Sequence, residues 1–321
     1  MTRRYVVRRV LQLGPTAAAI LLVGFLLIHL APGDPVLALA GENGDAEYYA
    51  FVREKFGLDE SLPTQLATYA GNVLRGDLGT SYVLGRPVAD VIAERLPATL
   101  LLTGTALVFS TLVGIAIGVF SATRRRRWPD VSVTVATLAM YSAPVFLLGQ
   151  LAILLFALRA GWFPVQGMTD ARTSATGLSH VLDVGHHLVL PALALATQEV
   201  AAVARLSRVG LLDELRRDHI RTSRAKGVPE RTVVLSHALR RALLPVVTVL
   251  GGRVGQLVAG AVIVEVVFAW PGLGRLLVTA MQARDAPVVL GVFLLVAVTV
   301  VVANLLTDLV YAWLDPRVRY R

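Results

Sequence analysis

The chain has 321 residues, of which 55% are hydrophobic and 17% are charged, and its formal net charge is +9. It contains no cysteine, which excludes a disulfide framework. Stretches of about 20 largely uncharged residues recur along the sequence, and each is long enough to cross the hydrocarbon core of a bilayer, which argues against a water-soluble protein.

Six apolar stretches predict an all-α integral membrane protein with six transmembrane helices. They lie at residues 11–30, 99–122, 131–158, 188–208, 245–267 and 288–312. The first stretch follows four arginines, a basic start that signal peptides share. Its apolar part is too long for a signal peptide, and Ala31-Pro-Gly-Asp-Pro35 stands where a cleavage site of small residues is expected. We therefore expect this stretch to be retained as the first span.

The basic residues predict which ends of the spans face the cytosol. With the N-terminus inside, the cytosolic segments hold Arg3, Arg4, Arg8, Arg9, the run Arg124–Arg127, the cluster from Arg205 to Arg241, and Arg317, Arg319 and Arg321. The segment between spans one and two is instead rich in Asp and Glu. This asymmetry follows the positive-inside rule and predicts that both termini are cytosolic. The positive net charge then reflects the orientation of the chain in the membrane. We expect no nucleic-acid partner, because binding nucleic acid would need the basic residues on one soluble face.

The spans and loops divide the chain into four parts. We expect a basic cytosolic N-terminus at 1–10, the first span at 11–30, an external segment at 31–97, and a five-helix core at 98–321 with a cytosolic loop at about 209–244. The external segment has two short amphipathic patterns, Glu47–Phe56 and Pro63–Leu74, that predict helices. Two interpretations stay open for it: a cap packed on the outer membrane face, or a docking surface or gate for something delivered from outside.

The most unusual segment is the polar stretch Asp218–Pro245 between two apolar runs. Apolar and basic residues from Val209 to Lys226 follow a helical period, Gly227 suits a left-handed helix end, and Pro229 suits the first turn of a following helix. The pattern predicts a helix, a sharp corner and a second helix that runs to the start of span five. From geometry alone, a pair of amphipathic helices held by anionic lipids stays an alternative.

This stretch resembles the EAA loop of permeases of ABC importers, in the variant of the dipeptide/oligopeptide/nickel group. Further motifs of the DppB/OppB-type inner-membrane subunit of that group occur in order: Ala31-Pro-Gly-Asp-Pro35, Leu74-Arg-Gly-Asp-Leu-Gly79, Val264-Glu-Val-Val-Phe-Ala-Trp-Pro-Gly-Leu-Gly-Arg-Leu-Leu277 and Leu314-Asp-Pro-Arg-Val-Arg319. The resemblance covers nearly the whole chain. It implies a type I ABC-importer permease fold with six spans.

The resemblance implies that the loop contains a coupling helix that sits in a cleft of a cytosolic ATPase. The residues that would carry the coupling are Arg221, Thr222, Ser223, Ala225, Gly227 and Pro229. The sequence departs from the general motif because Arg221-Thr-Ser223 replaces Glu-Ala-Ala, and Ser223 replaces the alanine usual in the peptide group. A contact that depends on the glutamate is therefore not carried over.

The chain lacks the means to hydrolyse ATP. No Gly-x-x-x-x-Gly-Lys-Ser/Thr loop is present, and the only lysines are Lys55 and Lys226. The six histidines show no His-Glu-x-x-His pattern, so we expect no metal site and no catalytic residues. We expect the chain itself to bind no cofactor, with ATP and magnesium on partner subunits.

The resemblance implies the partners, location and substrate class. We expect a second, homologous permease subunit forming a heterodimer, two cytosolic ATPase subunits or domains, an external substrate-binding protein, and the lipid bilayer of a bacterial inner membrane. The expected substrate is a di- or oligopeptide, moved by alternating access. A nickel or glutathione importer and a membrane scaffold that transports nothing stay open as alternatives, and the lack of a histidine or methionine cluster in a span makes nickel the weaker choice.

Polar residues inside the spans indicate a translocation pathway, because such groups are costly to expose to lipid. The candidates are Gln198, Glu199, Arg253, Gln256 and Glu265. Glu199 and Arg253 have two interpretations, a structural ion pair or a polar lining of the path. Glu265 lies toward the expected outer end of span five, where an external gate would form.

Overall fold

The computed structural model describes residues 14–15, 18–19, 21–23, 25–26, 50, 60–123, 140–170, 172 and 176–314, without the side chains of Thr248, Val254, Gln256, Asn304 and residues 306–314. The expected N-terminus at 1–10, most of the first span at 11–30, the start of the third span, the helix at Glu47–Phe56 and the C-terminal tail lie outside the described residues.

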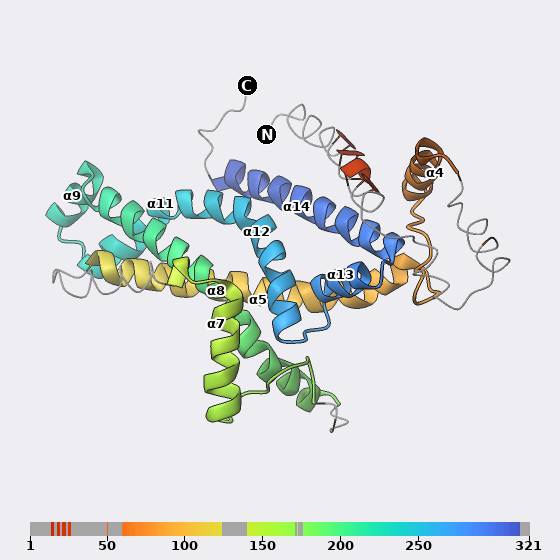
Figure 1. Ribbon diagram of the computed structural model, residues 1–321. Coiled ribbons are helices and arrows are strands. Elements are labelled where there is room, and N and C mark those ends of the chain that lie inside the picture. Colours follow the sequence, from red (N-terminus) through yellow and green to blue (C-terminus); the bar gives the residue numbers. More distant parts are fainter. Residues whose placement is uncertain are drawn as a thin grey trace. The chain divides into compact units, whose positions relative to one another are not determined.

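The described part of the chain is built from helices, with one isolated antiparallel bridge between Thr80 and Pro87. In chain order they are α4 (Leu62–Leu74), α5 (Val88–Thr123), α7 (Val145–Ala152) continued by the π-helical η1 (Ile153–Arg159), α8 (Leu178–Leu215), α9 (Asp218–Ala225), α10 (Glu230–Thr232), the π-helical η2 (Val233–Ala238), α11 (Leu239–Ala242), α12 (Leu244–Val267), α13 (Leu273–Gln282) and α14 (Ala286–Leu314) (Figure 1). The all-α class expected from the sequence is therefore what the described residues form.

The long helices extend beyond the apolar stretches that predicted them. The helix α5 begins 11 residues before the expected start at 99, and α8 spans 178–215 where 188–208 was expected. An apolar run marks the part of a helix that suits lipid, and the helix itself continues as long as its backbone hydrogen bonds do. Pro97 and Pro191 lie inside α5 and α8 without ending them.

Three described helices are long and apolar enough to cross a membrane. They are Val88–Thr123, Leu178–Leu215 and the part Ala286–Ala303 of α14. A fourth candidate is the pair Glu230–Ala242 and Leu244–Arg253, which is bent by 41° at its break. Two shorter apolar helices, Val145–Arg159 and Leu257–Val267, correspond to described parts of the expected third and fifth spans.

The chain divides into two compact units, and the divisions fall within α5, between α12 and α13, and within α14. The first unit contains Leu100–Trp270 and the residues from 302 onward, and the second contains the residues up to Thr99 together with Pro271–Val301. The second unit has its own apolar core, in which Val88 and Ile92 of α5 pack with Leu273 of α13 and Val288 and Val292 of α14. A Cβ on Gly291 would lie 2.7 Å from a methyl carbon of Val88, so the two helices approach closely there.

The first unit is organised around α8, which contacts α7, α11, η2 and α12. It also packs tightly against α5, because Gly114 and Gly118 lie one helical turn apart and face it. A Cβ on Gly118 would lie 2.6 Å from Cβ of Ser207 and 2.8 Å from the carbonyl oxygen of Ala204. A Cβ on Gly114 would similarly lie 2.6 Å from Cβ of Val203. Small residues spaced in this way let helix backbones approach closely, which is how membrane helices gain packing energy without a hydrophobic driving force.

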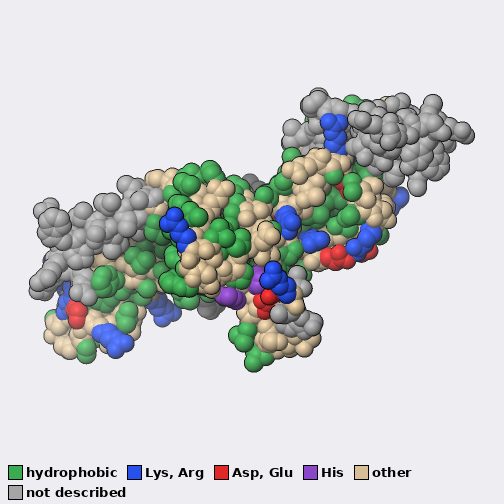
Figure 2. Space-filling model, turned by 60° about the horizontal axis from the view of Figure 1, so that its bottom comes forward, with side chains coloured by type: hydrophobic (Ala, Val, Ile, Leu, Met, Phe, Trp, Pro, Cys, Tyr) green, Lys and Arg blue, Asp and Glu red, His purple; other side chains and the backbone are tan. Residues whose placement is uncertain are grey.

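Apolar side chains also cover wide areas of the surface, and the face shown in Figure 2 presents large hydrophobic areas between groups of charged side chains. On α5, for example, Val108 and Leu112 are 59% and 65% exposed. Exposed apolar surface of this extent is unfavourable in water and suits lipid or partner helices.

Replacing Gly118 with Ala should loosen the contact between α5 and α8, because the added Cβ has no room. We expect a loss of about 1–3 kcal/mol of stability, the usual range for overpacking. The matched control is Gly104→Ala in the same helix, where nothing lies within 4 Å of the added Cβ. That variant should be neutral or stabilised by up to about 1 kcal/mol, since alanine favours helices over glycine. Thermal unfolding of the purified protein in detergent measures both, and equal midpoints for the two variants would contradict the packing argument.

Candidate coupling and translocation sites

The polar loop expected to contain a coupling helix forms the short helix α9, followed by the helical segment α10, η2 and α11. One break separates α9 from α8, and a second break separates α9 from α10. The periodic stretch Val209–Lys226, expected as one helix, is divided: α8 ends at Leu215 and α9 begins at Asp218. The expectation of a continuous helix was wrong because Arg217 is extended, with φ −75° and ψ 152°, and starts α9 in a new direction. The helical period of the sequence carried no sign of this break.

Two arginines and a histidine lie around the buried carboxylate of Glu214, at the end of α8 and beside the first break. One carboxylate oxygen lies 2.9 Å from Nε of Arg217, and the other lies 3.1 Å from Nε2 of His219 and 3.9 Å from Nη1 of Arg241. The Glu214 side chain is 8% exposed, whereas those of Arg217 and Arg241 are more than half exposed. Glu214 therefore connects α8 to both α9 and α11.

Apolar packing also holds α9 against its neighbours in the corner between α8 and α11. Ile220 of α9 is fully buried, and it shares a core with Leu211 of α8, Val233 and Ala238 of η2, and Ala242 of α11. A Cβ on Gly210 would lie 2.7 Å from the carbonyl oxygen of Ala242, so α8 and α11 also approach closely here. The short helix α9 is thereby attached to the long helix α8 and to the short segments η2 and α11, through the side chain of Ile220 and the carboxylate of Glu214.

The second break lies at Gly227, which has φ +78°. This left-handed conformation is what the sequence predicted for the end of a helix, and it strongly favours glycine. No atom lies within 4 Å of a Cβ added there, so the conformation, and not crowding, requires the glycine. Across the break, Arg224 donates two hydrogen bonds to Glu230, Nε to Oε2 at 3.0 Å and Nη2 to Oε1 at 2.6 Å, and these bonds raise the pKa of the Arg224 guanidinium.

The residues expected to carry the coupling lie on the surface of this corner. Arg221, Thr222, Ala225, Gly227 and Pro229 are exposed. Ser223 is the exception: it is half-buried, and its hydroxyl donates to the carbonyl oxygen of His219 at 2.9 Å. The five exposed positions are thus available to a partner, and Ser223 is occupied within α9.

The polar residues expected to line a pathway are only partly brought together. Arg253 of α12 lies 3.4 Å from both carboxylate oxygens of Glu199 on α8, so these two form the ion pair. Gln198 donates to the carbonyl oxygen of Ala143 at 3.2 Å. Glu265, near the end of α12, is fully buried beside the tight turn that leads to Trp270. The side chain of Gln256 lies outside the described residues.

Arg253 also lines a cavity of about 450 Å³ in the first unit. Its other polar lining comes from Arg205 and Arg208 of α8, Ser121 of α5 and Tyr141 ahead of α7. Nε of Arg208 donates to Oγ of Ser121 at 3.1 Å. The charge pattern of the sequence placed Arg205 in the cytosolic cluster and did not predict this cavity, although the spacing of three between Arg205 and Arg208 places them on one helix face.

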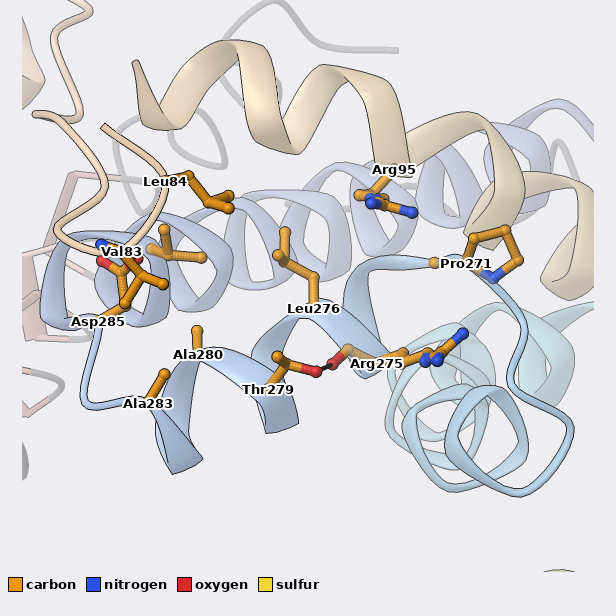
Figure 3. Close-up of a pocket in the computed structure, with 12 residues that line it drawn as sticks. Val83, Leu84, Arg95, Pro271, Arg275, Leu276, Thr279, Ala280, Ala283 and Asp285 are labelled. Carbon is orange, nitrogen blue, oxygen red and sulfur yellow. Dashed lines mark hydrogen bonds between the residues drawn. The ribbon is translucent and has the colours of Figure 1, made fainter. Parts of the chain in front are cut away.

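The second unit contains a smaller pocket of about 310 Å³ between α5, α13 and the start of α14. Figure 3 shows Arg95 and Arg275 near Pro271 at one end, and Val83 and Asp285 at the other. Asp285 is buried and accepts hydrogen bonds from the Ser81 hydroxyl and from the backbone N–H groups of Tyr82, at 3.0 Å, and Val83, at 3.3 Å.

Burial, with a contribution from Asp285, raises the pKa of Tyr82 to about 12. Apolar side chains between residues 78 and 96 pack against α13 and α14, and the pocket lies beside this contact.

Comparison with known proteins assigns the chain to a family. Residues 114–320 match the family described as the binding-protein-dependent transport system inner membrane component, and residues 1–103 match the N-terminal family of binding-protein-dependent transport system membrane components. The glutathione transport system permease proteins GsiC of Escherichia coli (strain K12) and Salmonella typhi are 42% identical over 318 residues, covering 99% of this chain and 99% of each relative.

The fold is similar to that of the inward-facing MetNI methionine ABC transporter, with a TM-score of 0.56 and 19% identity over 70% of this chain and 96% of that one. A second structure of the same transporter gives a TM-score of 0.57 at 20% identity, again over 70% and 96% of the two chains.

Long apolar helices joined by an exposed polar corner therefore define the membrane-embedded permease subunit of an ABC importer. The chain belongs to the binding-protein-dependent transport system inner membrane component family, in the dipeptide/oligopeptide/nickel group of ABC-importer permeases, which confirms the resemblance drawn from the motifs. It is a multi-pass protein of the bacterial inner membrane and has no ATPase site of its own. Its family works with ATPase and substrate-binding-protein partners.

Replacing Glu214 with Gln should free α9 from the end of α8, because it removes the negative charge that Arg217 and Arg241 share. Since both arginines are more than half exposed, we expect a contribution of about 1 kcal/mol, which corresponds to roughly a fivefold change in an opening equilibrium. Limited trypsin digestion followed by mass spectrometry should show faster cleavage after Arg217, Arg221 and Arg224. The control Asp213→Asn removes an exposed carboxylate one residue earlier and should leave the cleavage rate unchanged. Equal rates in both variants would show that Glu214 does not hold the corner.

Proposed function

We propose that this chain is one of two homologous permease subunits of an ATP-driven importer that moves short peptides, including glutathione, into the cell. Two ATPase subunits or domains bind and hydrolyse ATP with magnesium, an external protein delivers the substrate, and this chain binds no cofactor. The observation that carries the proposal is the exposed corner at α9 and Gly227, which lies between the long helices α8 and α12 of an ABC-importer permease.

The corner suits the transmission of force to the long helices. A coupling element must keep its angle under load, and α9 is attached to α8, η2 and α11 through Ile220 and Glu214. Its exposed residues face away from this attachment, where a cleft of an ATPase would receive them. Closure of the two ATPases would then move α8 and α12 and alternate the access to the path, as a switch between two packed states.

Six spans with both termini in the cytosol complete the proposed topology. The described residues supply three membrane-long helices and one bent pair. The remaining spans of the proposal are the first, at 11–30, and the third, which would join residues from 131 onward to α7 and η1. The distribution of basic residues supports this orientation because the corner, with Arg217, Arg221 and Arg224, falls on the cytosolic side.

Glutathione is the substrate that the similarity favours among the options left by the sequence. The relatives that match 99% of the chain are glutathione transport system permeases, and glutathione is itself a short peptide. A nickel importer is the weaker proposal, since no group of three or more His, Cys, Asp or Glu side chains that could hold a metal occurs among the described residues.

The replacement Gly227→Val should uncouple the transporter without unfolding it. A β-branched residue is strained at φ +78°, by roughly 1–2 kcal/mol, so the corner should change its angle. We expect substrate uptake by the assembled transporter to fall at least about tenfold while ATP hydrolysis continues. The matched control is Gly161→Val, which also has a positive φ, +66°, and open space around it, but lies between η1 and α8. Equal losses of uptake in both variants would assign the effect to general strain.

Uptake of glutathione by the complete transporter tests the proposed function directly. The test uses proteoliposomes that contain both permeases, with the ATPases facing the interior. Labelled glutathione should accumulate only when ATP is enclosed in the vesicles and the binding protein is present outside them. Transport lost when this chain is omitted would support the permease assignment. A scaffold would be favoured by two results together: the vesicles take up neither glutathione nor short peptides, and the ATPases still need this chain to stay at the membrane.

A further inference from the structure

We propose that the external binding protein docks on the second unit by inserting an apolar side chain into the pocket between α5, α13 and the start of α14, while Arg95 binds a carboxylate next to that side chain. This inference rests on the proposed function, because it names the place where the delivering partner is held. It adds a docking site whose position and chemistry come from the second unit alone.

The pocket lies outside the apolar spans, on the side that the charge pattern predicts to be external. Arg95 precedes the apolar stretch at 99–122, and α13 falls between the stretches 245–267 and 288–312. Of the lining residues, only Val288, the first residue of the last stretch, belongs to an apolar span. All of them belong to the second unit. A protein that reaches this pocket therefore comes from outside the cell membrane, where the proposed function places the binding protein.

The walls of the pocket suit an apolar side chain better than a peptide substrate. Most of the lining is apolar, and it includes Leu276 and Ala280 of α13 together with Val83 and Leu84, which are each more than half exposed. Such walls offer few partners to the backbone groups of a peptide. In protein interfaces, an apolar or aromatic side chain that fills a pocket of this kind supplies much of the binding energy.

The pocket is held in shape before any partner arrives. Asp285 is buried and accepts hydrogen bonds from the Ser81 hydroxyl and from two backbone N–H groups of the turn that follows it. At the start of α13, the backbone N–H of Leu273 donates to the Thr99 hydroxyl of α5 at 2.8 Å. A preformed pocket binds its partner with a smaller loss of conformational entropy than a mobile surface does.

Two arginines give the pocket a preference for an acidic partner at one end. Arg95 and Arg275 lie near Pro271, whereas Asp285 lies at the other end (Figure 3). Both arginines are exposed. A guanidinium group has five N–H donors, so an arginine that already makes one contact can still bind a carboxylate. The partner that fits therefore presents an apolar side chain beside an Asp or Glu side chain.

Filling the pocket should weaken docking, because a bulky side chain takes the space of the anchor. The complete transporter is placed in nanodiscs, and the Kd of the fluorescently labelled, glutathione-loaded binding protein is measured by anisotropy. We expect Ala283→Trp, at the end of α13 in the pocket wall, to raise the Kd at least about tenfold. The matched control Ala89→Trp changes an exposed residue of α5 outside the lining and should stay within about twofold of the unmodified protein.

Reversing the charge at Arg95 tests the acidic partner without filling the pocket. We expect Arg95→Glu to raise the Kd about tenfold and Arg95→Lys to stay within about threefold, because lysine keeps the charge. The control Arg75→Glu reverses an exposed arginine of the same unit outside the pocket and should leave the Kd unchanged. Added salt should weaken docking of the unmodified transporter more than docking of Arg95→Gln, because salt screens exposed charges.

Three outcomes would overturn the docking site. One is an unchanged Kd in both Ala283→Trp and Arg95→Glu, and another is an equal loss of affinity in the two control variants. The third is a loss of assembly with the second permease in both pocket variants, which would assign the pocket to the contact between permeases. In each case the unmodified transporter still binds the binding protein, so the proposed function stands. If the unmodified transporter does not bind it at all, the proposed function itself fails.

Discussion

The close approach of helix backbones along α8 is the constraint on which the first unit depends. Gly114 and Gly118 let α5 lie against it, and Gly210 lets α11 do so on the side of the polar corner. In lipid, apolar side chains gain nothing from leaving water, so contact between helices must come from tight packing and from polar groups. At these positions a single added methyl group would meet backbone or Cβ atoms closer than 3 Å. The position of α8 thereby sets the positions of its neighbours.

One helix consequently connects the proposed coupling corner with the cavity of the first unit. Glu199, Arg205 and Arg208 lie along α8, and Glu214 at its end lies close to Arg217, His219 and Arg241 at the corner. A movement imposed on α9 by an ATPase, as proposed, would be passed to α8 through the buried carboxylate of Glu214 and through Ile220, which are stiff contacts compared with an exposed loop. Because α12 is paired to α8 through Arg253 and Glu199, the same movement would also alter the cavity that both helices line. The proposed coupling corner and this cavity thus belong to one connected unit.

Much of the site was predictable from the sequence, and the failures have clear causes. Gly227 was identified as a left-handed helix end because few residues other than glycine adopt that conformation readily, and its φ of +78° agrees. The pairing of Glu199 with Arg253 was one of two options, since their separation of 54 residues leaves contact undetermined without the fold. The break at Arg217 was missed because the side-chain period continues across it, whereas its extended backbone and its contact with the buried Glu214 are seen only in the fold.

Composition predicted an all-helical membrane protein, because apolar length is a property of the chain itself, and the resemblance of its ordered motifs to a known family predicted the permease of an ABC importer. The family comparisons agree with that assignment. Only the tertiary structure decided which arginines face a cavity and which face outward, because Arg205 and Arg208 have the same charge signal as the rest of the cytosolic cluster. Their position depends on how α5, α8 and α12 pack, and that packing depends on contacts between residues distant in sequence, such as Gly118 with Ser207 and Glu199 with Arg253.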